Sequence, residues 1–160
     1  MEAAETQLAR ADKTVLAARI VWMGISGAVV VMGVLGAALQ QGVLPKPAAP
    51  AQLPLGVLKG VAYALSVAAI PASALIKKMV LRSLPAAQNA ASAVAAGVVV
   101  LCSVSEIPAL LGVVLLFLGA GFGDFCAMWL VSAVLLAYNF PFREQWLAAL
   151  RREKTPPAIG

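Results

Sequence analysis

Long apolar runs recur along the whole chain and constrain its fold more than any other feature. They cover residues 15–39, 55–80, 91–118 and 125–140, and short segments rich in proline, glycine or charge separate them. A helix of about 20 apolar residues is long enough to cross the hydrocarbon of a bilayer. The sequence therefore predicts an all-α, polytopic membrane protein with four transmembrane helices in two antiparallel hairpins.

The composition fits a lipid environment. Of the 160 residues, 62% are hydrophobic and 12% are charged, and the mean hydropathy is +0.93. Soluble domains are about half apolar and a quarter charged. We therefore expect the lipid bilayer itself to cover most of the surface. We also expect a homo-oligomer, or a hetero-oligomer with other membrane proteins, to cover part of it.

Polar segments divide the chain into three parts. Residues 1–14 form a cytoplasmic N-terminal segment, residues 15–142 form the transmembrane domain, and residues 143–160 form an interfacial or cytoplasmic tail. The first apolar run is longer than the roughly 7–15 residues of a cleavable signal core, so we expect a retained signal anchor. At the start of the tail, residues 142–154 place Trp146 opposite arginines at helical spacing, which is typical of a short interfacial helix.

Local signals predict how the helices bend and end. Pro71 is expected to kink the second span, because proline removes a helical hydrogen bond. Asp124 is placed to cap a fourth helix that begins at Phe125. Asn139 and Pro141 are expected to end that helix.

The basic residues indicate an orientation. Ten of the twelve lysines and arginines lie in or close to the N-terminal segment, the turn after the second span or the tail, and only Lys46 and Lys59 lie on the other side. Under the positive-inside rule both termini are cytoplasmic. We expect the protein in a bacterial inner membrane.

Several function classes are disfavoured by the inventory of residues. No basic stripe interleaved with aromatic residues indicates nucleic-acid binding. Cys102 and Cys126 have no CxxC spacing and no histidine companion, so neither a disulfide framework nor a metal site is predicted. No phosphate loop or catalytic motif is present, so we expect neither a cofactor nor enzymatic activity.

Glu106 is the one acidic residue expected deep within a span. It has more than ten largely apolar residues on each side, which places it near the middle of the bilayer. A charged carboxylate there costs roughly 2.5–3.5 kcal/mol, so the group should be protonated, paired or next to water. Glu106 is therefore a candidate proton-binding residue.

Residues near Glu106 in the sequence form a candidate supporting pocket. Cys102 and Ser103 precede it by four and three residues and share its helical face, and Ser105 lies to one side. Pro108 should bend the helix at a depth similar to that of Pro71 in the antiparallel second span. Such a pocket suits a proton carrier, but an alternative remains open: a neutral Glu106 donates a hydrogen bond between helices in a structural or assembly subunit.

Residues 106–117, Glu-Ile-Pro-Ala-Leu-Leu-Gly-Val-Val-Leu-Leu-Phe, resemble the second helix of the c subunit of rotary ATP synthases. The preceding turn Arg82-Ser-Leu-Pro85 is similar to that family's Arg-Gln-Pro loop. The resemblance implies that Glu106 binds a proton and that Pro108 and Gly112 shape the helix around it. The second span lacks the family's repeated glycines, and the likeness covers under half the chain, which as a whole also resembles small four-helix bacterial membrane proteins.

Overall fold

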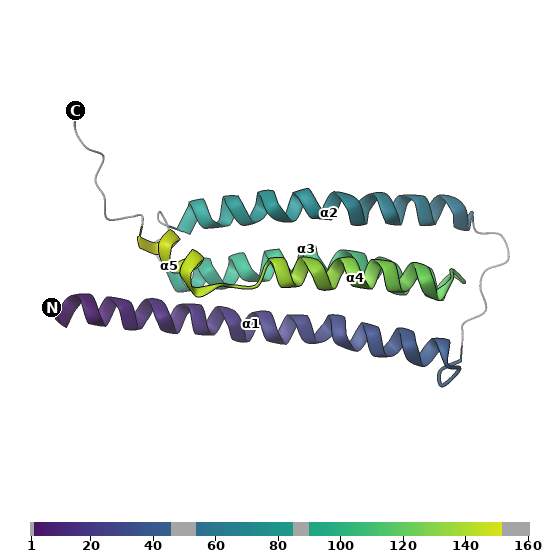
Figure 1. The fold of residues 1–160 in the computed structure, drawn as a ribbon, viewed down its shortest axis with the longest axis horizontal. Helices are drawn as coiled ribbons and strands as arrows, with labels where there is room; N and C mark the ends of the chain where they lie inside the picture. Colours follow the sequence, from purple (N-terminus) through teal and green to yellow (C-terminus); the bar gives the residue numbers. More distant parts are fainter. Residues whose placement is uncertain (1, 46–53, 85–89, 152–160) are drawn as a thin grey trace, which may run out of the picture.

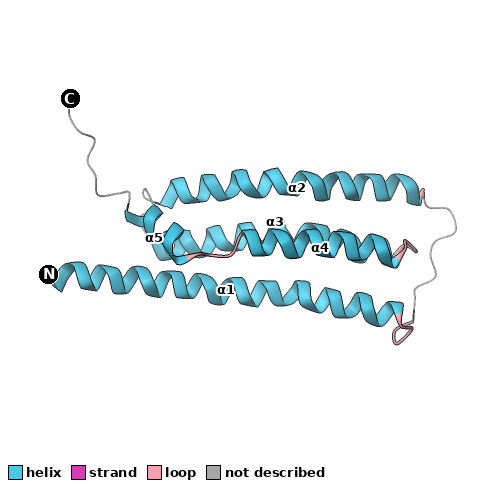
Figure 2. Cartoon of the chain, viewed as in Figure 1, coloured by secondary structure: helices cyan, strands magenta, loops and turns pink. Residues whose placement is uncertain are grey.

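The computed structural model describes residues 2–45, 54–84 and 90–151, and over these residues the chain is helical, without strands (Figures 1 and 2). The helices are α1 (Glu2–Gln40), α2 (Leu55–Ser83), α3 (Ala90–Phe117), α4 (Phe122–Tyr138) and α5 (Arg143–Arg151). The all-α prediction is confirmed. Most of the expected proline-rich loop (46–53), the turn 85–89 and the end of the tail (152–160) lie outside the described residues.

Three helices are long and apolar enough to cross a membrane: Asp12–Gln40, Leu55–Ser83 and Ser92–Phe117. The shortest has 26 residues. At 1.5 Å per residue it extends about 39 Å, more than the roughly 30 Å of hydrocarbon in a bilayer. Over the part of the chain that the structure describes, the fold is that of a membrane protein with three candidate spans.

α4 and α5 differ from these spans because the chain breaks between them. α4 has only 17 residues, and the axis turns by 55° before α5. Taken together the two helices have the length and composition of one further, bent span. The fourth span of the sequence prediction corresponds to α4, which ends at Tyr138.

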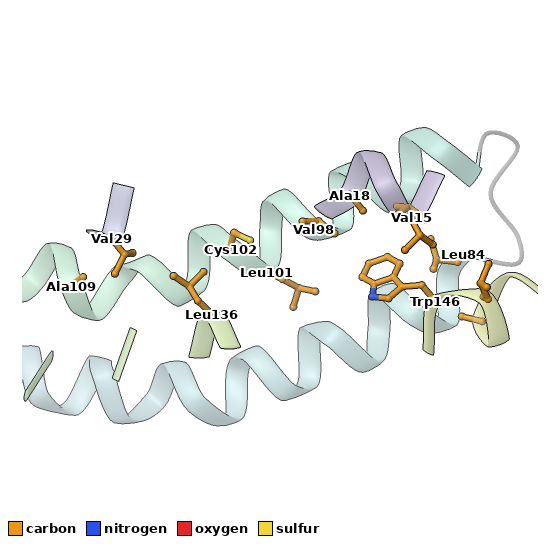
Figure 3. Close-up of a cluster of buried hydrophobic side chains, with 13 residues drawn as sticks. Val15, Ala18, Val29, Leu84, Val98, Leu101, Cys102, Ala109, Leu136 and Trp146 are labelled. Atoms are coloured by element: carbon orange, nitrogen blue, oxygen red, sulfur yellow. The ribbon is translucent and has the colours of Figure 1, made fainter. Parts of the chain in front are cut away.

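The apolar face of α5 packs against the rest of the bundle. Trp146 is fully buried and shares one cluster with Val15 of α1, Leu84 after α2, and Val98 of α3 (Figure 3). The sequence predicted that this face of the helix would lie in the membrane interface. In the structure the protein itself covers Trp146.

α3 lies at the centre of the bundle and packs against α1, α2 and α4. Figure 1 shows α1 and α2 on opposite sides of the α3–α4 pair. Two glycines permit close helix contacts: a Cβ at Gly36 of α1 would overlap the ring of Phe125, and one at Gly112 of α3 would lie 3.3 Å from the backbone oxygen of Phe125. Small residues of this kind allow membrane helices to approach closely.

Several helix boundaries differ from those predicted. α1 begins at Glu2, because nothing in the polar N-terminal segment breaks a helix. α2 ends at Ser83, beyond the predicted end at residue 80, and it remains one helix through Pro71, as α3 does through Pro108. α4 begins at Phe122 with Gly121 as its N-cap and no side-chain cap, so the prediction that Asp124 caps it at Phe125 is wrong.

Candidate functional site

Glu106 lies on α3 as a half-buried side chain, beside the face that packs into the bundle. Its Oε1 atom is buried and has no hydrogen-bond partner among the described residues. Ser26 Oγ, Asn139 Oδ1 and Trp146 Nε1 are in the same state, but none of these groups is an acid. An unpaired carboxyl in apolar surroundings favours the neutral, protonated form.

The residues expected around Glu106 lie on different faces of the bundle. Cys102, one turn before Glu106, is fully buried in the core (Figure 3), whereas Ser103 is exposed. Pro108 and Gly112 are buried on α3, and Pro71 is exposed on α2. Ser105 is buried, and its hydroxyl donates to the carbonyl of Leu101 at 2.8 Å.

Ser105 belongs to a polar cluster that the sequence reasoning missed. Asn139, directly after α4, donates from Nδ2 to Ser73 Oγ of α2 at 2.6 Å and to Ser105 Oγ of α3 at 2.9 Å. We call Ser73, Ser105 and Asn139 the serine–asparagine cluster; at most 1% of each residue is exposed. Because the two serines lie near the middle of their helices, α4 ends inside the bundle. The signal in the sequence was an asparagine at a helix end, which was interpreted only as a stop.

The last four backbone carbonyls of α4 all accept hydrogen bonds. A helix leaves its last four carbonyls without helical partners. Those of Leu135 and Ala137 accept from the backbone of Asn139 and Phe140. The carbonyl of Leu136 accepts from Trp22 Nε1 at 3.1 Å, and that of Tyr138 accepts from Lys77 Nζ at 2.7 Å. A terminus at this depth is therefore stable because α1 and α2 supply the missing donors.

The connection between α4 and α5 is held by α1. Arg19 Nε donates to the carbonyl of Pro141 at 3.4 Å, and its guanidinium lies 5.5 Å from the centre of the Phe140 ring. Arg143 forms a two-point contact with Asp12, with donor–acceptor distances of 2.8 and 2.9 Å. Planar pairs of this kind fix orientation as well as position.

α3 and α4 are also joined beside Pro108. Proline has no amide hydrogen, so the carbonyl one turn earlier loses its helical partner. The next amide, that of Ala109, donates to Ser132 Oγ of α4 at 2.8 Å. Ser132 is fully buried, and the bond ties the backbone of α3 to α4 where the helical pattern is interrupted.

The opposite end of the bundle, where α2 and α4 begin, holds a different polar group. Lys59 Nζ lies 2.7 Å from Asp124 Oδ2, and Tyr63 donates its hydroxyl to Asp124 Oδ1 at 2.9 Å. Asp124 thus ties α4 to α2 and does not cap α4. We call this end the Asp124 end and the other the α5 end.

The sequence has no histidine, and no group of three or more potential metal ligands occurs among the described cysteine, aspartate and glutamate residues. No family model, curated protein or solved structure matches this chain. The likeness of residues 106–117 to the c subunit of ATP synthases stays a prediction.

Proposed function

We propose that this chain is an integral membrane subunit that binds and releases a proton at Glu106. One observation carries the proposal: the Glu106 Oε1 atom is buried without a hydrogen-bond partner within the described residues. A single carboxyl group suffices for this role, because it is neutral in apolar surroundings and ionises when water or a cation reaches it.

Other side chains already join the helices around Glu106. The serine–asparagine cluster links α2, α3 and the end of α4, and Ser132 links α4 to α3. Trp22 and Trp129 donate to backbone carbonyls across the α1–α4 contact, at 3.1 and 2.7 Å. Glu106 makes none of these bonds, which favours a role other than joining helices within one chain.

The same observation supports a second candidate function. Glu106 lies beside exposed residues of α3, among them Ser103 and Leu110. A neutral carboxyl at this position is able to donate a hydrogen bond to another copy or another membrane protein. In that case the chain is a structural or assembly subunit.

The proposal includes a topology. α1, α2, α3 and the bent α4–α5 pair serve as four spans, with the α5 end at the cytoplasmic face of a bacterial inner membrane. The support is the position of the basic residues, since Arg19, Lys77, Lys78, Arg82 and Arg143 all lie toward the α5 end.

The test is the protonation state of Glu106 in lipid. Infrared difference spectra of the reconstituted protein, recorded while the pH is raised, should show the loss of one protonated carboxyl band. Glu106→Gln should abolish that band, whereas Glu144→Gln, which removes an exposed carboxylate of α5, should leave it unchanged.

The titrating band and the oligomeric state of two Glu106 variants together separate the two candidate functions. Proton binding predicts that Glu106→Gln keeps the wild-type mass in native mass spectrometry but loses the titrating band. An interchain hydrogen bond predicts that Glu106→Gln retains assembly, because an amide still donates, and that Glu106→Ala disrupts it. A wild-type spectrum with no titrating band would exclude proton binding.

A further inference from the structure

A basic pocket opens at the α5 end between α2, the end of α4, and α5. It encloses about 660 Å³, within the range typical of ligand sites. Its polar walls are formed by Lys77, Lys78, Arg82, Tyr138 and Gln145. Three cations therefore face one space.

Within the described part of the chain, the charges in this basic pocket are not balanced by acids. Among the described residues, no aspartate or glutamate lines the pocket. Two ion pairs occur among the described residues, Lys59–Asp124 and Arg143–Asp12, and both lie outside this pocket. Glu144 lines a neighbouring hollow together with Arg19 and Arg143.

Lys77 is the fixed cation of the pocket. Only 8% of the residue is exposed, and its ammonium group lies 4.5 Å from the centre of the Tyr138 ring. The ammonium group donates one hydrogen bond to the carbonyl of Tyr138, at the negative end of the α4 dipole. An ammonium group has three donors, so two remain for an anion.

An apolar groove continues from the basic pocket along α2 and α4. It encloses about 470 Å³ and shares Ala74 and Tyr138 with the pocket. Its other walls are entirely apolar: Ile70, Leu130, Val131, Val134 and Leu135. The groove runs from the cations toward the middle of the two helices.

We propose that the pocket and the groove together bind one anionic phospholipid. The phosphate of the headgroup lies among Lys77, Lys78 and Arg82, and an acyl chain lies in the groove. Basic pockets between membrane helices at the cytoplasmic side suit anionic lipid headgroups. A free anion would contact only the basic pocket, whereas a phospholipid matches both the charge of the pocket and the apolar groove that continues from it. The proposal is independent of any role of Glu106.

The test is lipid selectivity in native mass spectrometry. The protein is released from nanodiscs that contain equal amounts of phosphatidylglycerol and phosphatidylcholine, and the retained lipids are counted. We expect preferential retention of phosphatidylglycerol. Arg82→Gln should weaken that preference about fivefold, as expected for one cation near an anionic headgroup.

Matched variants separate this site from general surface charge. Lys13→Gln removes another exposed cation toward the α5 end, but Lys13 does not line the pocket, so selectivity should persist. Ala74→Phe blocks the passage shared by pocket and groove, and it should reduce retention of both lipids. Ala68→Phe changes an exposed alanine of the same helix outside the groove and should have no effect.

Three results would overturn the proposal. One is equal retention of the two lipids by the wild-type protein. Another is the same loss of selectivity in Lys13→Gln as in Arg82→Gln, which would indicate surface charge alone. The third is complete displacement of phosphatidylglycerol by inorganic phosphate with no effect of Ala74→Phe, which would indicate a site for a free anion.

Discussion

The lysines at the two ends of the bundle have different kinds of partner. At the Asp124 end, Lys59 contacts a carboxylate, which Tyr63 also contacts. At the α5 end, the ammonium group of Lys77 donates to a backbone carbonyl and lies over an aromatic ring, and Lys78 and Arg82 line an open pocket. A cation that is neutralised within the chain stabilises the fold, whereas cations without acids can bind a ligand from outside.

The two ends also differ in whether their helices are continuous. At the Asp124 end, α1 approaches α4 closely at Gly36, and the helices are continuous. At the α5 end the fourth segment is broken at Asn139, and the space beyond it is filled by Trp146. The stability of the α5 end should therefore depend on a few large or polar side chains.

The largest effect is expected from Trp146→Ala. Removing a fully buried indole leaves a cavity among Val15, Leu84 and Val98, and should lower the free energy of unfolding by about 3 kcal/mol. Circular dichroism during unfolding in sodium dodecyl sulfate measures the change. Phe142→Ala removes an aromatic side chain that is 49% exposed and should cost about 1 kcal/mol, mainly its edge contact with Phe140. Equal losses would show that α5 does not pack as described.

Gly36→Ala tests the close contact between α1 and α4 at the Asp124 end. The added Cβ overlaps the Phe125 ring, so the ring or α1 must shift, at an expected cost of about 2 kcal/mol. Gly27→Ala is the control, because a Cβ there meets nothing within 4 Å and the better helix propensity should give a small gain. The same unfolding measurement applies. Similar behaviour of the two variants would contradict the close contact between α1 and α4.

Asn139→Ala measures how much the serine–asparagine cluster contributes to the free energy of unfolding. It removes hydrogen bonds to Ser73 and Ser105, and since such bonds within membranes are weak, we expect a loss of about 1 kcal/mol. Ser66→Ala is the matched control, because that buried hydroxyl donates to the carbonyl of Ala62 in its own helix and to no other helix among the described residues. A loss in Ser66→Ala as large as that in Asn139→Ala would argue against a role of the cluster in joining helices.

The smallest effect is expected at the Lys59–Asp124 pair. The side chains are 32% and 20% exposed, so water and salt screen the attraction. A double-mutant cycle with Lys59→Met and Asp124→Asn should give a coupling of about 0.5 kcal/mol that decreases as salt is added. A coupling independent of salt would place the pair in a drier environment than the structure describes.

The sequence predicted the helical class and three of its four expected spans, because a long run of apolar residues leaves few alternatives. It did not predict that α4 ends beside Ser73 and Ser105, since which donors reach the free carbonyls depends on how distant helices pack. Trp22 and Lys77 supply those donors from more than 60 residues away.

The candidate site was predicted in part. The position of Glu106 in an apolar helix could be inferred from its neighbours in sequence, and the structure places it half-buried on α3. Ser105 was expected beside Glu106, but it faces Asn139, because adjacent residues of a helix point about 100° apart. The basic pocket was not predicted, because Lys78 and Arg82 were counted only as markers of orientation.

The contact between Arg143 and Asp12 joins residues 131 positions apart. During synthesis the ribosome makes α5 after α1, α2, α3 and α4, so Asp12 of α1 has no Arg143 to contact while the α2–α3 hairpin is made. We expect the α5 end to close only after translation has passed Trp146, and a nascent chain that stalls earlier should expose this part of α1 to insertion chaperones and proteases.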